Sequence, residues 1–166
     1  MSFTPLLTLP PAVAVHLAAA LAAIALGPVA LYRRRRDRAH KMVGYTWVTA
    51  MLLTATSSFA LSADILPLGA GFGPIHLLSL WVLWQLWRGV MAALAGNAQR
   101  HRGIMGGLYW TGLMVAGVFT LLPGRVLNRV LFPDLPEAGF VAIALGAGAL
   151  VWVNLRRQRG AGIGRA

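Results

Sequence analysis

The sequence predicts an all-α integral membrane protein, built as a bundle of five transmembrane helices. Hydrophobic residues make up 58% of the 166 residues, whereas charged residues make up only 11%. A soluble domain of this size carries more charge on its surface. Five apolar stretches approach the roughly 20 residues that a helix needs to cross a bilayer. These stretches are residues 12–32, 43–64, 75–95, 104–122 and 138–155.

The segments between the predicted spans carry loop signals. Residues 1–11, which contain three prolines, form a predicted outer segment, and residues 156–166 form a basic cytoplasmic tail. Pro74 suits the first turn of the third span. Between the last two spans, apolar and polar positions alternate at helical spacing, which predicts a short helix on the outer interface. Its apolar positions are Val126, Leu127, Val130 and Leu131, and its polar positions are Arg125, Asn128 and Arg129.

The distribution of basic residues predicts the topology. The net charge is +11, and only Arg125 and Arg129 of the fifteen basic residues lie in predicted outer segments. The positive-inside rule makes the other side cytoplasmic. The N-terminus is then outside and the C-terminus inside, as an odd number of spans requires. Because topology explains the positive charge, we expect a lipid bilayer and no nucleic acid as a partner. The chain has no cysteine, which excludes disulfides and thiolate metal sites.

The first four spans resemble two copies of one helical hairpin, a parallel tandem repeat. His16 stands at the outer start of the first span and His40 at the inner start of the second. His76 and His101 occupy the same places in the next two spans, and the spacings are 24 and 25 residues. A two-fold axis along the membrane normal would place the first and third spans opposite each other. His16 would then face His76, and His40 would face His101.

A facing pair of histidines predicts a haem site. Ionisable residues in membrane spans are costly and usually face the bundle interior. Two imidazoles can hold one haem iron without a cysteine and without an open position, which favours electron transfer over oxygen chemistry. We therefore expect two haem b groups, with all four histidines as iron ligands. Arg125 on the outer side and Arg102 on the inner side are candidate partners for the haem propionates.

The helix faces that carry the histidines are expected to point inward. Positions 4, 7 and 11 residues beyond a histidine share its face. Small residues on such a face let a flat macrocycle approach the backbone, and they equally permit close helix packing. The faces are Ala20, Ala23 and Gly27 after His16; Gly44, Trp47 and Met51 after His40; Met105, Leu108 and Gly112 after His101; and the bulkier Leu80, Leu83 and Trp87 after His76.

The leading hypothesis is a transmembrane dihaem b-type cytochrome. It would exchange electrons with a quinone or another small redox substrate and with a redox partner protein, and so act as a haem-dependent, quinone-linked oxidoreductase. One alternative is a copper or zinc site, in which Met105 could add a soft ligand next to His101. The other alternative is a non-catalytic membrane subunit or scaffold, whose histidines form hydrogen bonds between helices.

Four stretches resemble a family of bacterial predicted membrane proteins known as a domain of unknown function. The resemblance implies a multi-pass protein of the bacterial inner membrane and implies no activity. The arrangement of four histidines on four helices is also similar to that of two-haem transmembrane cytochromes b. The four stretches are HKMVGYTW at 40–47, PIHLLSLW at 74–81, HRGIMGGLY at 101–109 and GLMVAGVFTLLPGR at 112–125.

Overall fold

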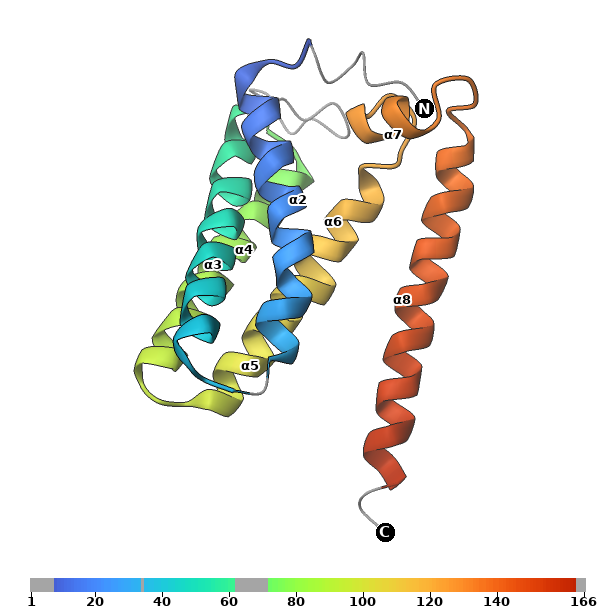
Figure 1. Cartoon of the computed structure of the whole chain (residues 1–166). Coiled ribbons are helices and arrows are strands. Elements are labelled where there is room, and N and C mark those ends of the chain that lie inside the picture. The colour runs from blue at the N-terminus through green and yellow to red at the C-terminus, as the bar shows by residue number, and fades with distance from the viewer. Residues whose placement is uncertain (1–7, 34, 62–71, 164–166) are drawn as a thin grey trace. The chain divides into compact units, whose positions relative to one another are not determined.

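The computed structural model describes residues 8–33, 35–61 and 72–163, and over these residues it is helical, with no strand (Figure 1). Most of the predicted outer segment and the end of the predicted second span lie outside the described residues, as do residues 164–166 of the tail. The chain divides into two compact units. We call Leu9–Met114 the N-terminal unit, and Val115–Ala166 together with Met1–Thr8 the C-terminal unit.

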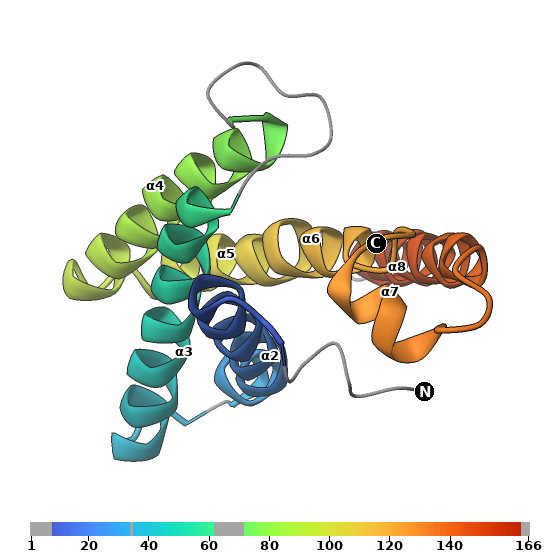
Figure 2. The same ribbon diagram turned by 90° about the horizontal axis from the view of Figure 1, so that it is seen from above.

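Antiparallel helices build the N-terminal unit (Figures 1 and 2). Helix α2 packs against α3, α3 against α4, and α4 against α5, while α5 and the turn that follows it return to α2. In this ring α2 and α4 are opposite each other, as are α3 and α5. The helices are α2 (Pro11–Tyr32), α3 (Arg38–Ser57), which a short 3-10 turn η1 (Ser58–Ala60) extends, α4 (Pro74–Leu94) and α5 (Ala98–Gly107).

Two of these helices are long and apolar enough to cross a membrane, Pro11–Tyr32 and Ile75–Leu94. A shorter apolar stretch covers Ala138–Ala149. The helices of the second and fourth predicted spans begin earlier than their apolar stretches do. Asp37 accepts a hydrogen bond from the backbone N–H of His40, and Asn97 does the same for Arg100. These N-caps start α3 and α5 before the apolar residues, so His40 and His101 lie in first helical turns.

Pro28 lies inside α2 and leaves one backbone carbonyl oxygen of this helix without its usual hydrogen-bond donor. Proline has no N–H, so the carbonyl oxygen of Ile24, four residues earlier, loses its usual helical partner. The hydroxyl of Tyr109 donates to this oxygen at 3.3 Å. On the same turn the indole N–H of Trp47 donates to the carbonyl of Ala23 at 3.0 Å. The ring of Tyr109 lies directly on Gly27, where any Cβ would overlap it.

Tyr109 reaches α2 from a π-helical turn, η2 (Leu108–Leu113), which joins α5 to α6 (Met114–Phe119). A π-turn holds more residues per turn than an α-helix and so changes which side chains point inward. Here Leu108, Tyr109, Gly112 and Leu113 are all buried. Gly112 lies against Trp81 of α4 while Tyr109 contacts α2. The widened turn therefore packs against two neighbouring helices at once.

The core of the N-terminal unit confirms three of the four expected inward faces and contradicts the fourth. Residues beyond His16, His40 and His101 are buried or half-buried as expected. Beyond His76, however, Leu80 is 54% and Trp87 is 61% exposed. Helix α4 buries a neighbouring face instead, because its packing against α3 and α5 rotates the helix. The buried core residues are Ala23, Trp47, Ala50, Met51, Ala55, Val82, Leu86, Met105, Leu108, Tyr109 and Leu113.

The C-terminal unit contains the expected short helix, α7 (Val126–Leu131), and the long α8 (Ala138–Ile163). The expectation that Asn128 lies on an outer polar face is wrong, since its side chain is fully buried. Its amide donates to the carbonyls of Leu121 at 2.8 Å and Pro136 at 2.9 Å. Both carbonyls belong to the irregular backbone beside α7, and that of Pro136 also accepts the backbone N–H of Gly139 at 3.1 Å. Asn128 thus joins the chain on either side of this helix.

We predict that the hydroxyl of Tyr109 stabilises the fold only while Pro28 is present. Tyr109→Phe should lower the free energy of unfolding by about 1 kcal/mol, the usual value of such a hydrogen bond. In a Pro28→Ala background the backbone N–H at position 28 supplies the missing donor, so the same change should cost close to nothing. Unfolding of the four proteins in mixed micelles measures both costs. Equal costs in the two backgrounds would contradict this account.

Candidate functional site

The histidines occupy the two ends of the N-terminal unit. His16 lies in the second turn of α2, and His76 lies in the first turn of α4. His40 and His101 lie in the first turns of α3 and α5. Because neighbouring helices run antiparallel, the first two are at one end of the unit and the last two at the other (Figure 1). We call these the His16/His76 end and the His40/His101 end.

At the first of these ends, His16 is oriented by a serine of α3. Its Nδ1 lies 3.1 Å from the hydroxyl oxygen of Ser57. That hydroxyl already donates its proton to the carbonyl of Leu53, so it accepts from Nδ1–H. This assignment leaves a lone pair on Nε2 of His16. One residue further on, Ser58 donates to Ser79 at 2.7 Å and so extends the polar layer from α3 to α4.

His76 is buried, and both of its ring nitrogens are in hydrogen bonds. Nδ1 accepts the backbone N–H of Gly73 at 3.0 Å, which caps α4. Nε2 therefore carries the proton and donates to the carbonyl of Leu61 at 3.1 Å. The rings of Phe59 and Phe72 lie against the imidazole, with centroids at 5.7 and 4.7 Å. His76 thus ties the end of η1 to the start of α4, and it offers no lone pair to a metal in this arrangement.

At the other end, His101 has the orientation that metal-binding histidines usually have. Its Nδ1–H donates to the carbonyl of Gly89 in α4 at 2.9 Å. A carbonyl on one ring nitrogen fixes the tautomer and directs the lone pair of the other nitrogen outward. Met105, one turn later, also packs on Gly89. The Gly89 backbone therefore positions the whole first part of α5.

His40 is the partner that the sequence predicts for His101. Burial lowers the pKa of His40, and the neighbouring His101 and Arg36 lower it further. The neutral form of His40 is therefore favoured. The Nδ1 atom of His40 is buried and has no hydrogen-bond partner in the described chain. This unsatisfied nitrogen is the strongest sign of a ligand-binding position among the four histidines.

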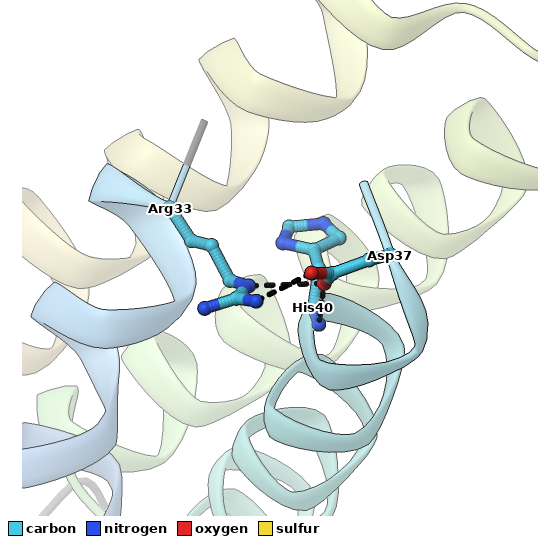
Figure 3. Close-up of polar contacts among 3 residues, drawn as sticks. All are labelled: Arg33, Asp37 and His40. Atoms are coloured by element: carbon cyan, nitrogen blue, oxygen red, sulfur yellow. Dashed lines mark hydrogen bonds and ion pairs between the residues drawn. The ribbon is translucent and has the colours of Figure 1, made fainter. Parts of the chain in front are cut away.

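An ion pair fixes the turn that carries His40 (Figure 3). The guanidinium of Arg33, at the end of α2, donates to both oxygens of Asp37, with Nε at 3.0 Å. Oδ1 of Asp37 also accepts the backbone N–H of His40 at 2.9 Å. The Arg33 hydrogen bond and the His40 N–H together lower the pKa of Asp37 to about 2. Sequence analysis missed this cap, although an aspartate three residues before His40 is a recognisable signal.

The two arginines predicted to bind propionates are in different units. Arg102 follows His101, is exposed, and donates from Nε to the carbonyl of Ala98 on its own helix at 3.3 Å. Arg125 belongs to the C-terminal unit, where it immediately precedes α7. Among the described residues, no group of three or more histidine, aspartate or glutamate side chains could hold a metal ion. A closed zinc site of four protein ligands is therefore not formed by these residues.

A model of one protein family matches residues 13–155, and its description is "Predicted membrane protein (DUF2306)". The match covers all four histidines and both candidate arginines. It confirms the resemblance that the sequence motifs indicated. Neither the curated proteins nor the solved structures contained a match to this chain.

The pKa of Asp37 leads to a prediction about pH. Because this pKa lies near 2 in the folded protein and near 3.8 otherwise, the ion pair stabilises the fold fully above about pH 4. This contribution is lost as the pH falls through 2. The amide proton of His40 should therefore titrate with a midpoint near pH 2 in NMR spectra. A midpoint near 4 would contradict the geometry, and Asp37→Asn should abolish the titration.

His76 should contribute more to stability than His16 does. His76→Ala removes two hydrogen bonds and leaves the Gly73 N–H buried without an acceptor, which should cost about 2–4 kcal/mol. His16→Ala removes the hydrogen bond to Ser57 and should cost about 1 kcal/mol. Denaturant unfolding of the wild type and the two variants compares these costs directly. If the two changes cost the same, the double role of His76 is wrong.

Proposed function

Because the chain belongs to the family of predicted membrane proteins (DUF2306), we propose that it is a multi-pass protein of the bacterial inner membrane that carries electrons on haem b. The chain would cross the membrane five times, with its N-terminus outside and its C-terminus inside. The partners are the lipid bilayer, a quinone or another small redox substrate, and a redox protein. The chain itself would hold the haem groups between its histidines.

The outward surface of α4 supports the membrane part of this proposal. Leu77, Leu80, Trp84 and Trp87 are all exposed on this helix. A row of large apolar side chains is unfavourable in water but suits contact with lipid tails. Helix α4 is also one of the two described helices that are long and apolar enough to cross a membrane.

The hydrogen bonding of His101 and the neutral, unpaired imidazole of His40 are the observations that support electron transfer on haem. His101 gives its Nδ1–H to Gly89, so its Nε2 can donate a lone pair to iron. His40 is kept neutral by burial and by nearby positive charge, and its Nδ1 lacks a partner. These features fit a haem held by two imidazoles. When bound, haem supplies one-electron chemistry. The chain orients the two rings, through the Asp37 cap on one side and through Gly89 on the other.

The His16/His76 end fits a second haem less well. His16 has its Nδ1–H bonded to Ser57, which again leaves Nε2 as a ligand. His76, in contrast, uses Nε2 to donate to Leu61. To bind the iron of a second haem, Nε2 would have to lose its proton and give up its hydrogen bond to Leu61. Two haems per chain therefore demand a rearrangement at His76, and one haem does not.

A scaffold or non-catalytic subunit is the second candidate, and the packing of α2 favours it. The small residues that could admit a macrocycle are covered by the chain's own aromatic rings. Tyr109 lies on Gly27, and Trp47 donates to the Ala23 carbonyl. In this reading His16 and His76 join helices through hydrogen bonds, as polar side chains do in membrane bundles.

One preparation separates these functions. The full-length protein is purified from haem-replete cells, and its reduced-minus-oxidised spectrum and haem-to-protein ratio are measured. We expect a bis-histidine b-type spectrum, reduced or lost in His40→Ala and His101→Ala but kept in the matched control Ser57→Ala. Loss of a second haem in His16→Ala and His76→Ala would support two sites. A colourless wild-type protein refutes the haem proposal. Bound copper would then favour a metal site, and neither haem nor metal would favour a scaffold.

A further inference from the structure

The His40/His101 end of the N-terminal unit carries a strongly basic surface. Two segments form it, the turn from α2 to α3 and the first turn of α5, and the hydrogen bond from His101 to Gly89 holds the second segment in place. All of its described cations are exposed, and only Arg33 is paired with an acid. We call the others the basic surface, namely Arg35, Arg36, Arg38, Lys41, Arg100 and Arg102.

Nothing within these segments neutralises the basic surface. Asp37 is the one acidic residue in residues 33–41, and residues 98–102 contain none. Asp37 is already held by Arg33 through two contacts. Six exposed cations in this small area repel one another, and an anionic partner would relieve that repulsion. The positive charge also reaches the chain itself, since Arg36 helps to lower the pKa of His40.

Apolar side chains border the basic surface and indicate the kind of anion. Met42 and Tyr45 of α3 and Leu94 of α4 are all exposed next to it. Cations beside exposed apolar and aromatic residues are typical of the headgroup region of a membrane. The surface also lies at the end of α2 and α4, the two helices that are suited to cross a bilayer. Phosphate groups of lipids lie at that level.

We propose that the basic surface binds the phosphate headgroups of anionic phospholipids such as phosphatidylglycerol. Guanidinium groups bind phosphate through paired, charge-assisted hydrogen bonds, which favours lipids over simple counterions. Binding is selective because zwitterionic headgroups bring no net charge to the six cations. This inference does not depend on haem and goes beyond the proposed electron transfer. Nucleic acid is the competing anion, and the exposed apolar border disfavours it.

Native mass spectrometry of the full-length protein in detergent tests the proposal. Equal amounts of phosphatidylglycerol and phosphatidylcholine are added, and the lipid that stays bound is measured at rising salt. We expect about tenfold greater retention of phosphatidylglycerol, falling as salt screens the charges. The triple variant Arg35→Gln/Arg36→Gln/Arg38→Gln should remove most of this preference, because each cation near a membrane contributes up to a roughly fivefold factor. Arg→Lys changes at the same three positions keep the charge and should keep the preference.

Variants that remove a single charge test the proposal even if the triple variant does not fold. Arg100→Gln removes one cation of the basic surface and should lower retention about fivefold or less. Arg129→Gln removes one exposed cation from α7 of the C-terminal unit and should change nothing. Helical content by circular dichroism confirms that each variant folds. Equal retention of the two lipids by the wild type, or equal effects of Arg100→Gln and Arg129→Gln, would overturn the proposal. Displacement of phosphatidylglycerol by a short oligonucleotide would assign the surface to nucleic acid instead.

Discussion

The carbonyl oxygen of Ile24 loses its helical donor because Pro28 has no N–H, and the packing of the N-terminal unit is arranged around this loss. Tyr109 supplies the replacement proton, and Trp47 serves the neighbouring carbonyl of Ala23. Gly27 is small enough for the tyrosine ring to approach α2. In an apolar bundle an unpaired carbonyl is costly. Helix α2, the π-turn and α3 are therefore held together by hydrogen bonds as well as by apolar contacts.

The need to pair buried polar groups also applies to the histidines, and it distinguishes their roles. His76 satisfies both ring nitrogens with backbone groups and thereby fastens the start of α4. His16 and His101 each use Nδ1 in a hydrogen bond that fixes the ring, which leaves a lone pair on Nε2. His40 keeps a buried nitrogen that nothing in the described chain satisfies. The four histidines thus differ in how many of their ring nitrogens are in hydrogen bonds, from both in His76 to a buried, unpaired Nδ1 in His40.

Electrostatics link the two proposals at the His40/His101 end. Arg36 of the basic surface favours a neutral His40, because it opposes a further positive charge there. A neutral imidazole is the form that coordinates a metal. The cations of the basic surface face outward, where an anionic headgroup would balance them. Asp37 pairs with Arg33 and caps the helix that carries His40, so it holds the turn in which these charges lie.

By itself the sequence determined the family of predicted membrane proteins, the helical class with the short helix α7, and the two ends at which the histidines lie. These properties depend on composition and on residues within one or two turns, such as the proline at the start of α4. Only the tertiary structure decided that Leu80 faces outward and that Asn128 is buried. It also decided that Tyr109 serves Ile24, 85 positions away in the chain. The rotation of a helix and the choice of its hydrogen-bond partners depend on residues that are distant in sequence. A local sequence pattern does not identify those residues.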